Sequence, residues 1–275
     1  MSLLNKFREQ AQDAKNTGLM HDMNETTAGG SARTLPAGKA LAVLTGYIES
    51  GLAAREYNGK PKPPAREMRL IFTIVGGKGL NTDGQPEDYV LEAGQYPSIG
   101  TFWTSVTTTD KSKAVKWFNR MRTNSFGTGA ETSFADFLGR AFMLPITHSE
   151  GKKDGKDVIY VNIDPATVDK PVNPITLEAL EVPEVPEEHY KLLLWDAPSK
   201  EQWDSLYIET PEDAEKSRNY LQEHLMQSLD FDTSPLAALL GVGTAGTATK
   251  VAGKVAGQVA GQTKVEKKSA IPEPD

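Results

Sequence analysis

Residues 139–163, GRAFMLPITHSEGKKDGKDVIYVNI, limit the fold more than any other part of the sequence. An apolar run is followed by a loop with three lysines and two glycines in six positions, and then by a second apolar run. Runs rich in β-branched and aromatic residues around a glycine-containing turn are typical of a β-hairpin. We therefore predict two antiparallel strands joined by a cationic turn.

Two runs upstream are typical of long strands. ALAVLTGYIES and EMRLIFTIV are rich in Val, Ile, Leu, Tyr and Phe, and Gly46 inside the first run predicts a bulge or a bend. The turn-forming residues of the segment between them, GLAAREYNGKPKPPAR, predict a loop. DYVLEAGQYPSI alternates less regularly and is a candidate third strand.

Helical periodicity appears between the third strand and the hairpin. Apolar residues at a spacing of 3.6 predict a helix over 110–122 behind a Thr-Asp cap, and a second helix with Ser133 as its cap and apolar positions from Phe134 to Phe142. The resulting order of strands and helices is that of a five-stranded OB-fold, which has a helix between its third and fourth strands. We predict a mainly β, α+β protein built on a five-stranded OB-like barrel.

The other segments frame this barrel. We predict that the chain divides into four parts. Residues 1–38 form an N-terminal helix and a flexible arm, and residues 39–208 form the OB-like domain. Residues 209–240 form a C-terminal helical segment, and residues 241–275 form a low-complexity tail with a VAGK/VAGQ repeat. Five prolines in 164–190 predict a chain that lies over a surface without forming a new layer. Trp195 and Trp203, around a turn, are expected to anchor the chain back on the barrel.

Charge is divided unevenly along the chain. Residues 36–160 hold 16 basic and 13 acidic residues, whereas residues 161–240 hold 5 and 17. This asymmetry predicts a polyanion-binding surface beside an acidic segment that competes with it or solvates it. The absence of cysteine excludes disulfides and thiolate metal sites, and no apolar run approaches the roughly 18 residues of a membrane span. We expect a soluble, intracellular protein without membrane attachment.

Catalytic signatures are not found in the sequence. The four histidines are scattered and no two have metal-ligand spacing. IVGGKGLNTDG has glycines and a lysine after a strand but lacks the GK[ST] ending of a phosphate-binding loop, and no serine has a nucleophile-elbow context. We therefore expect a protein that is not an enzyme and has neither a cofactor nor a metal.

Several of these stretches together resemble a known family. The chain resembles single-stranded-DNA-binding proteins from the replication modules of tailed phages. The resemblance rests on LAVLTGYIESG through RLIFTIVG, the helix around Trp117, the GRAF…YVNI hairpin and LLLWDAPSKEQWDSLYI. Relatives of this family are often labelled phage structural proteins. The resemblance covers Lys39 to Ile208. It implies an OB-like fold that coats unpaired DNA with little sequence preference during replication or recombination, in the cytoplasm of the host cell.

The same resemblance implies protein partners. Members of the family usually recruit them through an acidic C-terminal tail, so a DNA polymerase, helicase or recombinase is expected as a partner of the acidic C-terminal region. This chain departs from the pattern, because it ends in AIPEPD after a basic VEKK. The acidic stretch 164–232 is the alternative recruiting segment, and the oligomeric state, including a homo-oligomer, stays open.

The residues expected to contact DNA fall in two groups. Coating a single strand requires cations that follow the phosphates and flat side chains on which bases stack. In OB-folds, the loops between strands one and two and between strands four and five flank the binding face. The candidates are Arg55, Tyr57, Lys60, Lys62, Arg66 and Arg69 in or beside the first of these loops, and Lys152, Lys153, Lys156 and Tyr160 on the second hairpin.

These features also have simpler interpretations. A KKDGK turn is typical of a solvated loop, and the cations of the helix over 110–122 suit a solvated face as well as a second phosphate track. Trp117 and Phe118, at helical spacing, are expected in the core. For the whole protein, the alternative function is a virion structural protein, a capsid or tail component with no nucleic-acid role.

Overall fold

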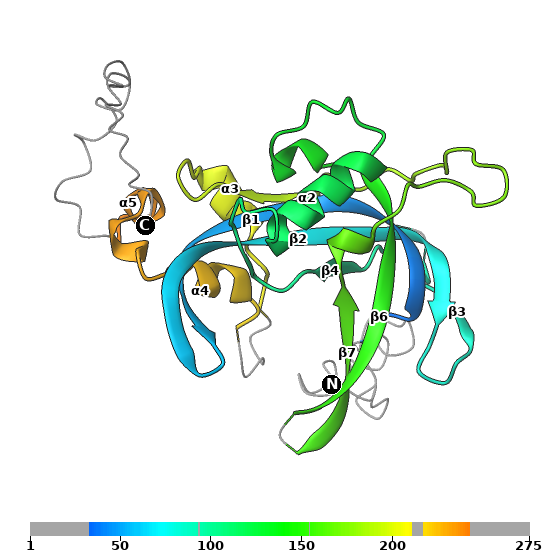
Figure 1. Ribbon diagram of the computed structural model, residues 1–275, viewed down its shortest axis with the longest axis horizontal. Helices are drawn as coiled ribbons and strands as arrows, with labels where there is room; N and C mark the ends of the chain where they lie inside the picture. Colours follow the sequence, from blue (N-terminus) through cyan, green and yellow to red (C-terminus); the bar gives the residue numbers. More distant parts are fainter. Residues whose placement is uncertain (1–32, 93, 154, 211–216, 243–275) are drawn as a thin grey trace, which may run out of the picture.

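The computed structural model describes residues 33–92, 94–153, 155–210 and 217–242. Within these ranges the fold is mainly β, with one large antiparallel sheet and a few helices (Figure 1). The predicted N-terminal helix, most of the arm that follows it and nearly all of the low-complexity tail lie outside the described residues.

Eight strands belong to the sheet. In chain order they are β1 (Ala37–Tyr57), β2 (Lys60–Leu80), β3 (Pro86–Asp88), β4 (Ser98–Gly100), β5 (Thr104–Ser105), β6 (Ala141–Lys153), β7 (Lys156–Ile163) and β8 (Lys191–Leu193). The α-helices are α2 (Lys113–Asn124), α3 (Lys200–Ser205), α4 (Tyr220–Met226) and α5 (Pro235–Leu240). Short 3-10 turns are η1 (Phe134–Phe137), η2 (Pro165–Thr167), η3 (Glu187–His189) and η4 (Phe231–Thr233).

The sheet does not close into the predicted five-stranded barrel. Its main path is β3-β2-β1-β6-β7, while β4 and β5 also pair with β2, and β8 pairs in parallel with β1. The three short strands β3, β4 and β5 therefore share the outer edge of β2, and none of them pairs with β7 among the described residues. The predicted strand count of five is wrong, because β3 and β4 take the place of one third strand and because the short strands β5 and β8 were not predicted.

The first two strands are far longer than the sequence pattern suggested. The segment expected to be a loop continues both strands, and the chain reverses only at Asn58 and Gly59, with φ of 51° and 72°. Positive φ at both central residues is the requirement of the two-residue turn that an Asn-Gly pair favours. The bulge predicted at Gly46 is confirmed by a register shift between Leu44 and Gly46, where Ile71 of β2 approaches closely.

The helix predictions hold in part. The first helix exists, but it begins at Lys113 and Ser112 provides its cap: Ser112 Oγ accepts from Val115 N at 3.1 Å. Ser133 does cap the second segment, yet this segment ends after a single 3-10 turn because β6 begins at Ala141. In the C-terminal helical segment predicted over 209–240, the first described helix begins at Tyr220, and 211–216 lie outside the described residues.

Apolar side chains pack on both faces of the β1–β2 ribbon. On one face, Trp117 and Met121 of α2 and Phe137 of η1 join Leu44 and Phe72 in the largest cluster. Because side chains alternate between the faces of a strand, Ile71 points the other way. It lies in a second cluster, with residues of the C-terminal helices. Figure 1 shows α2 and α4 on opposite sides of the ribbon.

The tryptophan anchor predicted from the sequence is confirmed. Trp195 is 1% exposed and belongs to the second cluster, and Trp203 packs against it. The backbone N of Trp195 donates to Oε2 of Glu49 on β1 at 3.1 Å, and the hydroxyl of Tyr47 donates to the other oxygen of the same carboxylate at 2.6 Å. These bonds tie the chain after β8 to β1, and Trp195 shares its cluster with Leu221 of α4.

Candidate nucleic-acid interface

Two hairpins extend from the sheet toward the same side of the molecule. The β1–β2 hairpin ends at Asn58 and Gly59, and the β6–β7 hairpin ends beside Gly155. Figure 1 shows both turns at the lower edge of the view, with α4 between them. A groove of about 340 Å³ lies between the two ribbons. It is lined by Arg69, Gly100, Thr101, Phe102, Trp103, Tyr160, Val161, Asn162 and Ile163.

Arg69 is the one cation that lines this groove. It lies in β2 on the face of Ile71 and packs its guanidinium over the Tyr220 ring, with its Cζ 5.3 Å from the ring centroid. Among the described residues no carboxylate pairs with it, and its buried Nε has no hydrogen-bond acceptor. Burial lowers the pKa of Arg69, although an arginine stays charged under physiological conditions. The groove therefore holds a partly desolvated positive charge without a counter-ion.

Gly100 makes room for this guanidinium. A Cβ at Gly100 would lie 2.6 Å from Nε and 2.7 Å from Nη2 of Arg69, which is closer than Cβ contacts allow. Gly100 pairs with Ile71 in the sheet, so its backbone is fixed beside β2. The absence of a side chain at Gly100 thus allows Arg69 to lie flat against β4.

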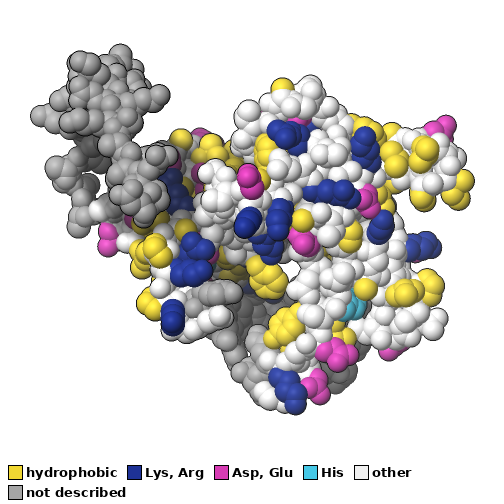
Figure 2. Space-filling model, viewed as in Figure 1, with side chains coloured by type: hydrophobic (Ala, Val, Ile, Leu, Met, Phe, Trp, Pro, Cys, Tyr) yellow, Lys and Arg dark blue, Asp and Glu magenta, His cyan; other side chains and the backbone are white. Residues whose placement is uncertain are grey.

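Exposed aromatic side chains flank the cation. Phe102 is 67% exposed and Tyr160 is 41% exposed, which is unusual for groups of this size. The Tyr160 ring lies over Gly151 on the neighbouring strand, where a Cβ would approach Cε2 of the ring to 2.6 Å. Figure 2 shows hydrophobic side chains exposed on the face that carries the β6–β7 hairpin.

Helix α4 packs against two residues that line the groove, Arg69 and Trp103. The His224 ring stacks on Trp103 with centroids 4.0 Å apart and planes 11° apart, and its Nε2 lies 3.7 Å from Oε2 of Glu67. Burial and the positive charge of Arg69 lower the pKa of His224, while burial raises the pKa of Glu67. The lowered pKa of His224 favours its neutral form beside the charged Arg69.

The structure separates the cations that the sequence grouped around the first loop. Arg66 forms a two-pronged ion pair with Asp196, with Nη2 2.8 Å from Oδ1, so its charge is compensated. Lys60 and Lys62 are exposed near the end of the β1–β2 hairpin, and Arg55 lies further along it, half-buried. Among the side chains of the first predicted group that the structure describes, only Arg69 lines the groove.

The second predicted group also divides. Tyr160 lines the groove, whereas the exposed Lys152 lies at the hairpin end with its Nζ 3.9 Å from Oδ1 of Asp157. The side chains of Tyr57, Lys153 and Lys156 lie outside what the structure describes. The cations of α2 are partly engaged, since Arg120 pairs with Asp169.

Sequence reasoning missed three aromatic residues of the site. Phe102 and Trp103 are in GTFWTS, where two large aromatics follow one another in a run of Thr, Ser and Gly. A polar context of this kind marks aromatics that are not buried by periodic packing, and it could have identified them. Tyr220 carried no comparable signal, because only the packing of α4 brings its ring to Arg69.

The described residues contain no group of three or more His, Asp and Glu side chains arranged to hold a metal ion. None of the helices in the described part of the chain has the length and apolar character needed to cross a membrane. No protein-family model, curated protein or solved structure matches the chain. The site is thus defined by its own geometry: an uncompensated cation between exposed aromatic rings, in a groove between two hairpins.

Proposed function

We propose that the protein binds single-stranded DNA in the groove between the β1–β2 and β6–β7 hairpins and coats it with little sequence preference. The observation that supports this most is the guanidinium of Arg69, which lacks a carboxylate partner and lies among exposed aromatic side chains. A buried charge without a partner is costly, and a bound phosphate would compensate it with charge-assisted hydrogen bonds.

The aromatic residues suit unpaired bases. Phe102 and Tyr160 present rings on the two walls of the groove, and an exposed base can stack on either of them. Stacking contributes about 1–3 kcal/mol per base and tolerates every base, since all have a π-face. Double-stranded DNA keeps its bases stacked on one another, so the rings favour a single strand.

The exposed lysines of the two hairpins would contact further phosphates of a DNA strand that continues beyond the groove. Lys60 and Lys152 lie near the two ends, outside the groove but on the side to which both hairpins extend. Cations of this kind follow phosphates and release counter-ions, so binding should weaken as salt increases. The resemblance described above supports a role in phage DNA replication or recombination in the host cytoplasm, with a polymerase, helicase or recombinase recruited by the acidic C-terminal region.

Fluorescence anisotropy of a labelled oligo-dT, titrated with the full chain at two salt concentrations, tests the proposal. We expect binding that weakens with salt, and a loss of about 10- to 100-fold in affinity for Arg69→Met. Arg66→Met is the matched control, because it removes an arginine three residues away whose charge Asp196 already compensates. Its affinity should stay within a few-fold of the wild type.

Two outcomes would contradict the proposal. Absence of oligo-dT binding at the lower salt concentration would exclude it and favour the virion structural protein. Equal losses for Arg69→Met and Arg66→Met would place DNA binding away from the groove. A duplex of the same length, titrated in parallel, should bind more weakly than the single strand.

A further inference from the structure

A second surface, remote from the groove, is built around residues 172–179, here called the projecting turn. Val172 and Ala179 form an isolated bridge at its base, and Leu180 N donates to Pro171 O at 2.8 Å. Inside it, Asn173 exchanges backbone bonds with Glu178 and Leu177, and its side-chain oxygen accepts from Ile175 N at 2.9 Å. The projecting turn is therefore a hydrogen-bonded unit with a definite shape.

This unit holds two large aliphatic side chains in solvent. Ile175 is 89% exposed and Leu177 is 74% exposed. Figure 2 shows hydrophobic side chains gathered on the segment that extends to the right of the view. Exposed aliphatic groups that lie together mark interaction sites more often than groups scattered singly.

The backbone of Leu177 adds an independent observation. Among the described residues, Asn58 and Leu177 alone combine a side chain with positive φ, at 51° and 61°. Asn is common in this conformation, whereas a branched residue such as Leu is an outlier there and costs roughly 1 kcal/mol or more. Glycine would remove this strain, so the fold of the turn does not explain the leucine. An exposed and strained leucine suggests that its side chain has a partner.

A hollow of about 340 Å³ lies at the base of the same segment, here called the socket. Its lining is Phe126, Gly127, Thr128, Gly139, Arg140, Ala141, Pro171, Ala179, Leu180 and Val182. Phe126 is 61% exposed and Val182 is 38% exposed, so apolar surface is open to solvent inside it. The socket and the projecting turn are continuous, since Ala179 belongs to both and Pro171 of the socket directly precedes the turn.

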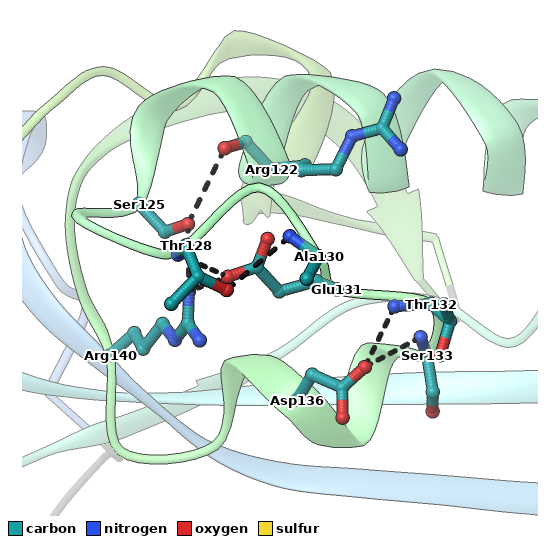
Figure 3. Close-up of polar contacts among 9 residues, drawn as sticks. All are labelled: Arg122, Ser125, Thr128, Ala130, Glu131, Thr132, Ser133, Asp136 and Arg140. Atoms are coloured by element: carbon teal, nitrogen blue, oxygen red, sulfur yellow. Dashed lines mark hydrogen bonds and ion pairs between the residues drawn. The ribbon is translucent and has the colours of Figure 1, made fainter.

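The wall of the socket is held in place by a buried carboxylate. Glu131, 5% exposed, accepts from Thr128 N at 2.9 Å and from Nη1 of Arg140 at 2.5 Å (Figure 3). Asp136 accepts from the backbone N of Thr132 and Ser133 in the same loop. The socket is thus formed before any partner arrives.

We infer that the occupant of the socket is the projecting turn of a second copy of this chain. A two-fold symmetric interface must be self-complementary, with the same patch on both subunits. This patch meets that condition, because one segment supplies both an aliphatic projection and an adjoining apolar hollow. The charges are also complementary: the exposed Glu178 flanks the projecting side chains, while the exposed Lys170 lies next to Pro171 of the socket.

Self-association of the full chain, measured by sedimentation velocity without DNA over a range of concentrations, tests this inference. We expect a monomer–dimer equilibrium, and a weakening of about 30-fold or more for Leu177→Gly, as for a central interface residue. Leu177→Gly removes the side chain and suits the positive φ, so the thermal stability of the monomer should not fall. Leu91→Gly, at an exposed leucine elsewhere (65% exposed), should leave the dimer unchanged.

Cross-linking between copies tests the geometry. The chain has no cysteine, so a Leu177→Cys variant and a Phe126→Cys variant each carry a single thiol. When the two variants are mixed under mild oxidation, the mixed disulfide should form in preference to either homodimer. A chain that is monomeric at every concentration, or a dimer that Leu177→Gly leaves intact, would overturn the inference. If Leu177→Cys cross-links with itself as readily as with Phe126→Cys, the inference that the projecting turn of one copy occupies the socket of the other is wrong.

Discussion

The groove and the ends of the two hairpins both carry positively charged side chains, which are half-buried in the groove and exposed to solvent at the hairpin ends. Arg69 is half-buried between aromatic rings with no carboxylate partner, whereas Lys60 and Lys152 are exposed at the hairpin ends. Arg66, three residues from Arg69, is exposed and paired with Asp196. Water screens an exposed charge and a carboxylate compensates a paired one, so only Arg69 has much to gain from a bound phosphate. The number of cations is thus a poorer guide to a binding site than their environment.

The largest expected effect comes from Gly100→Ala. The new Cβ would overlap the Arg69 guanidinium, which is the flexible end of a side chain and can swing away without a change in the fold. Oligo-dT affinity, measured by anisotropy, should fall about 10- to 100-fold, as in Arg69→Met. The melting temperature should change little, which would separate a local displacement from unfolding.

Gly76→Ala is the control for this substitution. Its Cβ would meet Leu41 only at 3.9 Å, and its φ is not in the left-handed region, so the same change is harmless there. Wild-type affinity in Gly100→Ala would show that the position of Arg69 does not affect DNA binding. It would contradict the claim that Arg69 contributes more to binding than the lysines at the hairpin ends.

The next effect in size concerns the rings. Phe102→Ala and Tyr160→Ala should each cost about 1–3 kcal/mol of binding free energy, because each removes one stacking surface. The salt dependence of binding should stay unchanged in both variants, since no charge is lost. Isothermal titration with oligo-dT at two salt concentrations measures both quantities. A change in salt slope with no loss of affinity would show that the rings do not contact bases.

A smaller effect is expected at the hairpin ends. Lys60→Gln or Lys152→Gln should reduce the slope of log affinity against log salt by at most about 0.7, the value for one phosphate contact on a single strand. Their effect on affinity at moderate salt should be well below that of Arg69→Met. A loss of oligo-dT affinity at a hairpin end that equals or exceeds the loss in Arg69→Met would show that the hairpin ends contribute as much to binding as the groove, or more.

The smallest effect is a pH dependence at the α4 end of the groove. Burial and Arg69 lower the pKa of His224 below its ordinary 6.5. The unfolded chain therefore binds more protons than the folded one in this range, and the free energy of unfolding should decrease as pH falls below about 6.5. Burial raises the pKa of Glu67, so this carboxyl contributes with the opposite sign on acidification, and the variant below separates the two contributions.

His224→Phe isolates this contribution. It keeps a ring against Trp103 but cannot be protonated, so its stability should fall less on acidification than that of the wild type. Chemical denaturation at several pH values measures the difference. Identical pH profiles for the two proteins would show that His224 does not titrate in this range.

The predictions from sequence succeeded where neighbouring residues decide the structure. The β6–β7 hairpin, the bulge at Gly46 and the buried Trp195 all follow from local composition and spacing. They failed where the competing partner was distant. The third strand divides into short pieces on β2, and the second helix stops after one turn because β6 pairs with β1 from Ala141 onward.

Only part of the candidate site could be found in this way. Arg69 and Tyr160 were predicted as members of two basic groups, but nothing in the local sequence separates Arg69 from Arg66. That separation depends on Asp196, which lies 130 residues away along the chain. Phe102 had a local signal in its polar surroundings, and Tyr220 had none.

The amino-acid sequence alone determined the strand-rich character of this protein, the β6–β7 hairpin and the residue types available for binding a polyanion. These properties depend on side-chain periodicity and turn chemistry, which act over a few residues. The tertiary structure alone decided that the sheet stays open, that Arg69 keeps an uncompensated charge beside Phe102 and Tyr160, and that Leu177 projects beside an apolar hollow. Each of these depends on which distant segment occupies a strand edge or supplies a counter-ion, and local sequence does not contain that information.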